Sequence, residues 1–292
     1  MDILIDLQPR PAFSKDGLPA GVHIFVTVVG VNGPFLHVFC VCAAVAFGSW
    51  LASVITKNNS QVDRLWSLMP EVYIGIFAAE AGFANARLNL MLALSILWGA
   101  RLTYNFWRKG GYRRGGEDYR WPILRARMRP WVFQLFNFGF ISAYQHFLLL
   151  LIAAPAAVAF DRQATPLNAV DLGAAAAFLV FLGGETLADQ QQWRFHARKA
   201  RGEASGFLSE GLFRYSRHPN FFCEMAMWWC IYAFAVAASG AWLHPVIAGP
   251  VLLTLLFQGS TRFTESITLQ KYPAYADYQR RTSRLVPLPP RS

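Results

Sequence analysis

Runs of about 20 apolar residues alternate with short polar segments along most of the chain. These runs lie at roughly 35–55, 66–83, 88–106, 132–159, 168–188, 220–239 and 244–263. A helix of about 20 residues crosses a hydrocarbon core of about 30 Å. The pattern therefore predicts an all-α, polytopic membrane protein with about seven transmembrane helices. The fourth run is overlong, and Pro155 near its end predicts a tilt or a kink there.

The first 34 residues do not follow this pattern. Asp2 and Asp6 stand where a cleavable signal peptide has positive charge, and Pro9 and Pro11 interrupt the apolar stretch. We expect residues 1–34 to form an N-terminal arm that is interfacial, or lumenal or periplasmic. The remaining residues are expected to form one membrane domain.

Composition and charge support the membrane assignment and orient it. Of the 292 residues, 54% are hydrophobic and only 15% are charged, whereas soluble domains average about a quarter charged. Of 27 lysines and arginines, 23 fall on one side of the predicted topology, at 57–64, 101–129, 194–217 and 262–291. The positive-inside rule then places the C-terminus and these segments in the cytosol. Because topology explains the basic charge, we expect no nucleic-acid partner.

The four cysteines lie in or beside apolar runs, at positions 40, 42, 223 and 230. Their spacing suggests neither a zinc site nor a disulfide framework, so we expect small buried residues and no bound metal.

Two of the basic segments contain polar residues in informative patterns. In "NNSQVDRLWSLMPE", 58–71, Asn59 and Ser60 suit helix N-caps, and Asp63 and Trp66 share a helix face. These residues either cap a helix beside an interfacial tryptophan or line the cytosolic mouth of a cavity. Segment 100–130 interleaves arginines with aromatic residues and four glycines. It is either a loop that binds lipid headgroups or a shaped site for phosphates and a heterocycle.

The stretch "GLFRYSRHPNFFCE", 211–224, lies at the start of the sixth apolar run. Pro219 suits the first position of a helix, whose N-terminus would then be prepared for an anion. Asn220 and Glu224 are four residues apart and share a face, as do Glu185 and Asp189 at the end of the fifth run. This arrangement could hold a ligand that carries phosphates, hydroxyls and an amide. Alternatively, it forms interhelical ion pairs.

Several segments together carry a resemblance. The stretch 211–224, "ADQQQWRF" at 188–195 and the tail "KYPAYADYQRRTSRLVPLPP" resemble the C-terminal region of the steroid 5-alpha-reductase superfamily. "NNSQVDRLW" and "GEDYR" resemble more closely a branch of unknown function in that superfamily, and the similarity runs in order over about 57–288. The resemblance implies a seven-helix, reductase-like membrane domain over 35–292, whose cytosolic loops close over NADPH. The implied cofactor-binding residues are Arg101, Arg113, Arg114, Asp118, Tyr119, Asp189, Tyr215, Arg217, His218, Asn220 and Glu224.

The chain departs from the superfamily pattern at two places. Steroid reductases carry a Gln–Glu pair shortly before a proline, where this chain reads "SLMP" at 67–70, and Trp98 stands where they have a tyrosine three residues before an arginine. The nearest substitutes are Asp63 and Tyr104.

The first functional hypothesis is an NADPH-dependent reductase of an activated C=C bond in a lipophilic substrate, which would be steroid-like, isoprenoid or a fatty enone. Tyr104 or a protonated Asp63 would donate a hydrogen bond to the developing oxyanion. The substrate would reach the site from the lipid among the first four spans. We expect it to be lined by Asn59, Trp66, Trp98, Gln134, Gln145 and His146. Taken alone, His146 fits a hydrogen-bonded structural residue better than an acid–base group.

Two further hypotheses remain. Isoprenylcysteine and phospholipid methyltransferases share the "RHPN" turn and the following glutamate, so the cofactor could be S-adenosylmethionine. The tail has a single glutamate, Glu265, where those enzymes usually show an adjacent pair. A non-catalytic membrane scaffold is the third hypothesis. The sequence does not define an oligomeric state.

Overall fold

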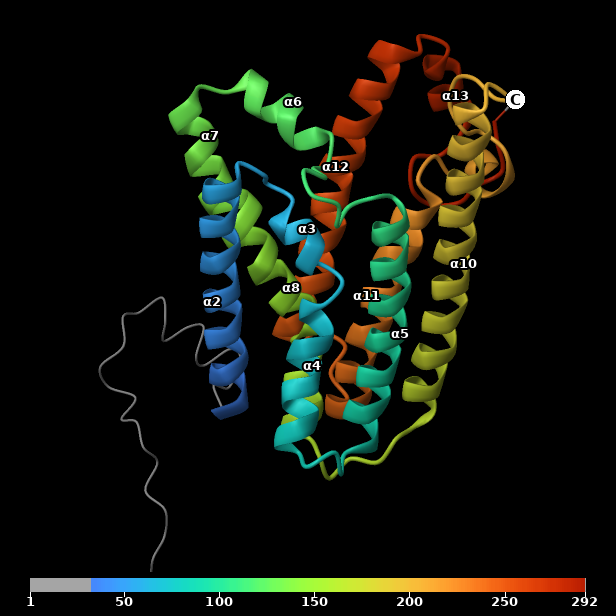
Figure 1. Cartoon of the computed structure of the whole chain (residues 1–292). Coiled ribbons are helices and arrows are strands. Elements are labelled where there is room, and N and C mark those ends of the chain that lie inside the picture. The colour runs from blue at the N-terminus through green and yellow to red at the C-terminus, as the bar shows by residue number, and fades with distance from the viewer. Residues whose placement is uncertain (1–32, 292) are drawn as a thin grey trace, which may run out of the picture.

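The computed structural model describes residues 33–291, and within them it contains helices and no β-strand. The helices stand side by side in a bundle (Figure 1). Their bounds are α2 (Gly33–Thr56), α3 (Gln61–Leu65), α4 (Met69–Glu80), α5 (Ala86–Arg108), α6 (Arg120–Arg127), α7 (Pro130–Phe136), the π-helix η2 (Asn137–Tyr144), α8 (Gln145–Ala153), α9 (Pro155–Asp161), α10 (Ala169–Ala200), η3 (Gly211–Arg214), α11 (Pro219–Ser239), η4 (Pro245–Ile247), α12 (Ala248–Lys271) and α13 (Tyr275–Arg281).

Five stretches of helix among the described residues are long and apolar enough to cross a membrane. They are Gly33–Thr56, Pro130–Asp161, Ala169–Ala200, Pro219–Ser239 and Pro245–Lys271. The all-α membrane fold is thus confirmed, whereas the count of seven stays a prediction. The two remaining spans correspond to α4, which has only 12 residues, and to α5, which carries several polar residues. The N-terminal arm lies outside the described residues except for Gly33 and Pro34, which begin α2.

The fourth apolar run is broken, as its length and Pro155 predict. α8 ends at Ala153 and α9 begins at Pro155, because proline cannot supply the N–H that a continuing helix needs. The sequence gives no sign of the π-helix η2 in the same run. Its first residue, Asn137, donates from Nδ2 to Ser53 Oγ of α2 at 2.9 Å. π-Helical turns are rare and occur frequently at functional sites.

Close approaches hold the interior of the bundle together. α8 packs against α2, α4 and α12, while α10 packs along α11. Trp98 of α5 and Trp228 of α11 meet edge to face with ring centroids 4.8 Å apart. Gly99 lets α4 and α5 approach, because a Cβ atom there would lie 2.4 Å from the Ser67 carbonyl oxygen and 2.2 Å from Glu71 Oε2. Any larger residue at position 99 would push the two helices apart.

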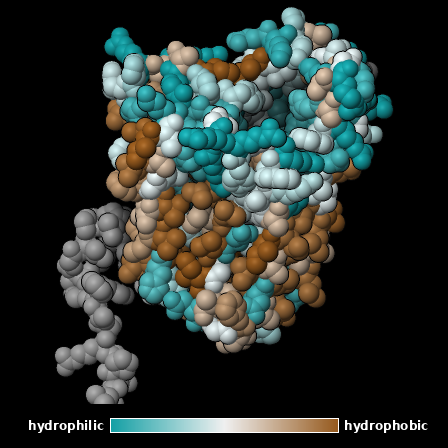
Figure 2. Space-filling view, in the orientation of Figure 1, coloured by the Kyte–Doolittle hydropathy of each residue, from teal (hydrophilic) through white to brown (hydrophobic). Residues whose placement is uncertain are grey.

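The basic segments gather at one end of the bundle, which we call the basic end. It comprises the α2–α3 connection, residues 109–130, residues 200–218 and the C-terminal tail after α12 (Figure 1). Figure 2 shows hydrophilic side chains concentrated at this end, which is hollowed near its middle, above a body that is largely hydrophobic. The tail returns over the start of α11, where the Arg217 amide donates to the Ser283 carbonyl at 2.8 Å and the His218 amide to the Arg284 carbonyl at 3.1 Å.

At the opposite end, a buried ion pair joins α5 to α10. The Arg87 guanidinium donates from Nε and Nη2 to the two Asp171 carboxylate oxygens at 2.7 and 2.8 Å. Its remaining donors reach the Thr165 and Pro166 carbonyls and the Thr165 hydroxyl. Both charged side chains are almost fully enclosed, at 1% and 0% exposure. The pair therefore fixes the ends of two long helices and leaves no donor for a ligand.

Candidate functional site

Three carboxylates from α10 and α11 surround one guanidinium of α5 near the basic end. Arg101 Nη2 lies 2.6 Å from Glu185 Oε2 and 3.8 Å from Glu224 Oε2, and Nη1 lies 2.7 Å from Asp189 Oδ2. All three carboxylate residues are buried. We call these four residues the Arg101 cluster. It brings Glu185 and Asp189, one of the predicted pairs of residues, together with Glu224 of the other pair.

Neighbouring side chains hold the carboxylates of the Arg101 cluster in place. The indoles of Trp98 and Trp228 donate to the two Glu224 oxygens at 2.7 and 3.1 Å. Asn105 Nδ2 donates to Asp189 Oδ2 at 2.7 Å. Lys109 Nζ lies 3.7 Å from the other Asp189 oxygen. The pKa of Lys109 is lowered because burial penalises its charged form, and the attraction of Asp189 opposes this effect.

Some buried polar atoms of the Arg101 cluster lack a hydrogen-bond partner. Arg101 Nη2 and Glu185 Oε2 are close but poorly aligned, and Arg101 Nε also has no partner among the described residues. Buried polar atoms in folded proteins are almost always hydrogen-bonded, to protein, water or ligand. The cluster therefore has capacity for additional donors and acceptors.

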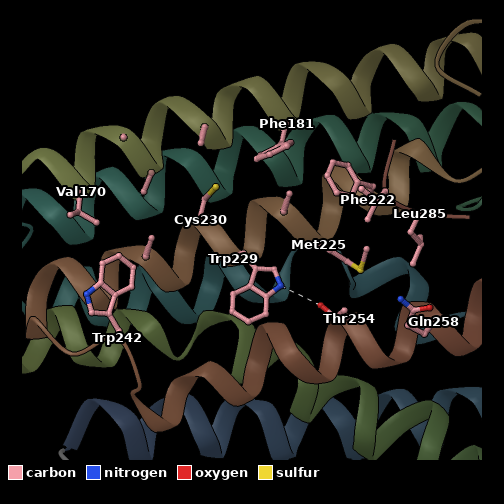
Figure 3. Close-up of a pocket in the computed structure, with 16 residues that line it drawn as sticks. Val170, Phe181, Phe222, Met225, Trp229, Cys230, Trp242, Thr254, Gln258 and Leu285 are labelled. Carbon is pink, nitrogen blue, oxygen red and sulfur yellow. Dashed lines mark hydrogen bonds between the residues drawn. The ribbon is translucent and has the colours of Figure 1, made fainter. Parts of the chain in front are cut away.

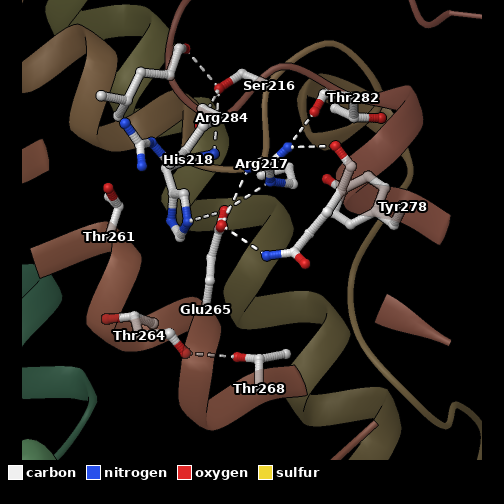
Figure 4. Close-up of polar contacts among 12 residues, drawn as sticks. Ser216, Arg217, His218, Thr261, Thr264, Glu265, Thr268, Tyr278, Thr282 and Arg284 are labelled. Carbon is white, nitrogen blue, oxygen red and sulfur yellow. Dashed lines mark hydrogen bonds and ion pairs between the residues drawn. The ribbon is translucent and has the colours of Figure 1, made fainter. Parts of the chain in front are cut away.

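Arg217 and His218, both predicted to bind the cofactor, are instead engaged with Glu265 of α12 (Figure 4). Arg217 forms a forked pair with the two Glu265 oxygens at 2.6 and 3.1 Å, and His218 Nε2 lies 3.0 Å from Oε1. Arg217 Nη1 also donates to the backbone carbonyls of Gln279 and Thr282 in the tail. In this structure these contacts form a latch that ties the start of α11 to α12 and the tail.

In the sequence, Tyr215 precedes Arg217 and His218, and Asn220 follows them. α11 begins at Pro219, as predicted, so Asn220 is in its first turn. Asn220 is partly exposed, and its side chain has no hydrogen bond to any described residue. Tyr215 is 44% exposed. Both side chains are accessible to a ligand.

The segments "NNSQVDRLW" and "GEDYR" dock onto each other. Asn58 Nδ2 donates to the Gly116 carbonyl at 2.9 Å, and the Asn59 amide to Glu117 Oε1 at 2.8 Å. Ser60 is the N-cap residue of α3 but makes no cap hydrogen bond. Its hydroxyl accepts from the Asp118 amide at 2.8 Å instead. The pairing explains why the two motifs occur together, and it corrects the expectation of side-chain capping.

Asp63 and Asp118 are both engaged within this docked unit. Trp121 Nε1 donates to Asp63 Oδ2 at 2.9 Å. The pKa of Asp63 is raised, first because surrounding groups desolvate the carboxylate and second because Asp118 is near. Asp118 is paired with Arg120, whose Nε donates to Oδ1 at 2.8 Å. Neither carboxylate contacts the Arg101 cluster through a described interaction.

Arg113 and Arg114 are exposed in the loop after α5. Gly110 and Gly115 flank them with φ values of 84° and 81°, a conformation that favours glycine. A Cβ atom at Gly116 would lie 2.7 Å from the Gly110 carbonyl oxygen. The loop is therefore folded tightly on itself, and it carries the two arginines at consecutive positions. Tyr119, 52% exposed, follows shortly after.

The remaining predicted residues are spread over different environments. Tyr104 is 58% exposed, and its ring lies against Trp107 and under the Arg108 guanidinium. It therefore faces away from the interior. Gln134 is also exposed, and Trp66 is partly buried. Asn59, Trp98, Gln145 and His146 are buried, as a lining role requires.

Outside the Arg101 cluster, five side chains have buried polar atoms without a hydrogen-bond partner among the described residues. They include Glu71 Oε2, the Tyr73 hydroxyl and both ring nitrogens of His146. Tyr73 and His146 are fully buried, on α4 and α8, which pack together. The expectation that His146 is a hydrogen-bonded residue was therefore wrong. Sequence reasoning missed Glu71 and Tyr73, although a glutamate next to a proline in an apolar run was a visible signal.

These features define a polytopic helical membrane protein with a buried charged cluster near its basic end. The family described as "Protein of unknown function (DUF1295)" matches residues 49–282, so the chain belongs to this family. The chain is similar to "Uncharacterized protein C594.04c" of Schizosaccharomyces pombe, with 39% identity over 258 residues, covering 82% of this chain and 75% of that protein. No solved structure matches the chain.

Proposed function

We propose that this protein is an NADPH-dependent reductase of an activated C=C bond in a lipophilic substrate. The main support is the Arg101 cluster, in which three buried carboxylates surround one guanidinium whose Nε has no hydrogen-bond partner among the described residues. The hydroxyls and the amide of a nucleotide cofactor can donate hydrogen bonds to such carboxylates. The motif resemblance to the steroid 5-alpha-reductase superfamily provides independent support for the same ligand.

The residues at the basic end fit the two chemical parts of NADPH. Glu185 and Glu224, with the accessible amide of Asn220, suit the ribose hydroxyls and the nicotinamide amide. Arg113 and Arg114 suit the phosphates, because guanidinium forks bind phosphate oxygens in pairs. Arg217 would act as a positioning residue that holds the tail over α11. When bound, NADPH supplies the hydride.

The chain's own contribution to the reaction would be a hydrogen bond to the substrate oxygen in a dry interior. Tyr73 and His146 fit this role better than Tyr104, which is exposed, or Asp63, which accepts from Trp121. Both are buried between helices. The ring nitrogens of His146 have no partner among the described residues, and the Cys42 thiol is the neighbour of the Tyr73 hydroxyl. Loss of one donor of this kind typically lowers kcat by about 10²–10³-fold. The substrate would reach them from the lipid through α2, α4, α5 and α8.

Ligand-dependent stability of the full-length protein in detergent tests this proposal. NADPH and NADP⁺ are expected to raise the unfolding midpoint, because a ligand at 100 times its Kd stabilises the native state by about 2.7 kcal/mol. The double variant Arg113→Gln/Arg114→Gln should lose most of the NADPH effect. Arg129→Gln, which changes an exposed arginine at the same end, should keep it. A midpoint raised only by S-adenosylmethionine would replace the reductase with a methyltransferase, and no response to any of these ligands would favour a scaffold.

A further inference from the structure

A long apolar groove runs along the outside of the bundle between α10 and α12, with α11 as its floor (Figure 3). It arises because α11 packs closely along α10 whereas α12 packs on α8, so α10 and α12 diverge over α11. The groove has a volume of about 700 Å³, within the range of about 300–1,000 Å³ that is typical of small-molecule sites. It lies away from α2 and α4, where the proposed substrate route begins.

The lining of the groove is suited to a hydrocarbon chain. Its floor and one side carry small residues, including Gly173, Ala177 and Ala226, while Phe181, Phe222, Trp229 and Trp242 form bulkier walls. The Trp229 indole donates to the Thr254 hydroxyl at 3.3 Å, so the main polar atoms within the groove satisfy each other. A chain lying there would meet apolar atoms along its length.

The end of the groove near the tail has a different character. Gln258, Leu285 and Val286 line it, and the Arg284 guanidinium donates to Gln258 Oε1. Arg262 follows Gln258 by one turn of α12 and is exposed. The pKa of Arg284 is lowered, first by burial and second by the positive charge of Arg262, while the attraction of Glu265 opposes this effect. Two neighbouring arginines, Arg262 and Arg284, thus lie at the end of the groove near the tail. Of these two, only Arg284 has a described side-chain partner, the neutral Gln258.

We infer that the groove binds a phospholipid with a net negative headgroup, whose acyl chain lies along α11 and whose phosphate lies beside Arg262 and Arg284. An apolar groove that ends at two arginines is complementary to this class of molecule. An anionic headgroup would neutralise the two arginines, and each basic residue near such a headgroup contributes about 1 kcal/mol, or about five-fold in affinity. A zwitterionic lipid would fill the groove but gain little affinity from the arginines.

The test uses the full-length protein in nanodiscs that contain equal amounts of dioleoylphosphatidylglycerol and dioleoylphosphatidylcholine. Native mass spectrometry after release counts the lipids retained. We expect the wild type to retain dioleoylphosphatidylglycerol in preference to dioleoylphosphatidylcholine, and Arg262→Gln to lower this preference by about five-fold. Arg129→Gln, the matched exposed arginine, should leave it unchanged.

A second pair of variants tests whether the lipid occupies the groove itself. A Cβ atom at Gly173 or at Gly183 of α10 meets no atom within 4 Å, and only Gly173 lines the groove. Gly173→Phe should therefore reduce lipid retention, whereas Gly183→Phe should not. Equal retention of both lipids by the wild type would overturn the inference. Equal effects of the two glycine variants, or a lipid-free dimer covering the groove, would also overturn it.

Discussion

Replacing Arg87 by alanine is expected to lower the free energy of unfolding by about 3–5 kcal/mol. Arg87 and Asp171 are enclosed in the structure, at 1% and 0% exposure, and every described contact of the guanidinium is to an acceptor of this protein. Removal of the arginine leaves the Asp171 carboxylate buried without its partner, and the cost of an uncompensated buried charge exceeds the value of the pair. Asp171 also accepts from the Asn168 amide at the start of α10, so this helix end would be weakened.

Unfolding in mixed micelles titrated with SDS measures this effect. Arg162→Ala removes an exposed arginine from the same end of the bundle and should stay within about 0.5 kcal/mol of the wild type. The double variant Arg87→Met/Asp171→Leu should recover much of the loss, because it removes both charges and keeps the volume. If Arg87→Ala unfolds at the same SDS content as the wild type, the pair is not buried as described.

The second large effect is expected for Glu265→Ala, which should release the C-terminal tail from α11. Glu265 accepts from Arg217, His218 and Gln279 at once, and its loss leaves the Arg217 charge without a counter-ion. We expect a loss of about 3–5 kcal/mol and faster hydrogen exchange at the Arg217, His218 and Leu288 amides. These amides donate to backbone carbonyls that join the start of α11 to the tail.

Hydrogen exchange read by mass spectrometry separates tail release from general unfolding. Glu203→Ala removes an exposed carboxylate that pairs with Arg201, and it should change neither stability nor exchange at those amides. Unchanged exchange in Glu265→Ala would show that the tail is held without the latch. NADPH affinity of the same variant distinguishes two roles for Arg217. A positioning role predicts weaker binding, whereas direct phosphate binding by the released arginine predicts tighter binding.

Local sequence patterns predicted the features that depend on nearby residues. Apolar runs located most of the long helices, because a membrane-spanning helix must be apolar over a fixed length. Pro219 marked the start of α11, and Pro155 marked a break, because proline lacks an N–H and restricts the backbone. The spacing of Glu185 with Asp189 put both on one face of α10, which α5 and α11 then cover.

The partners of charged residues could not be predicted in this way. Arg217 is paired with Glu265, 48 positions away, and Arg87 with Asp171, 84 positions away. Such pairs depend on which helices become neighbours, and the residues around each partner carry no local signal of it. The π-helix η2 and the unpartnered His146 escape sequence reasoning for the same reason, since both follow from packing. Tyr104 has the residue type expected of a donor, but its position on α5 turns it outward.

An experimental structure of the full-length protein with saturating NADPH is the most direct test of cofactor binding at the basic end. We expect nucleotide density there, in contact with Glu185 or Glu224 on one side and with Arg113 or Arg114 on the other. A structure in which side chains close over the Arg101 cluster and no nucleotide lies beside it, although NADPH is present in excess, would contradict NADPH binding by this protein.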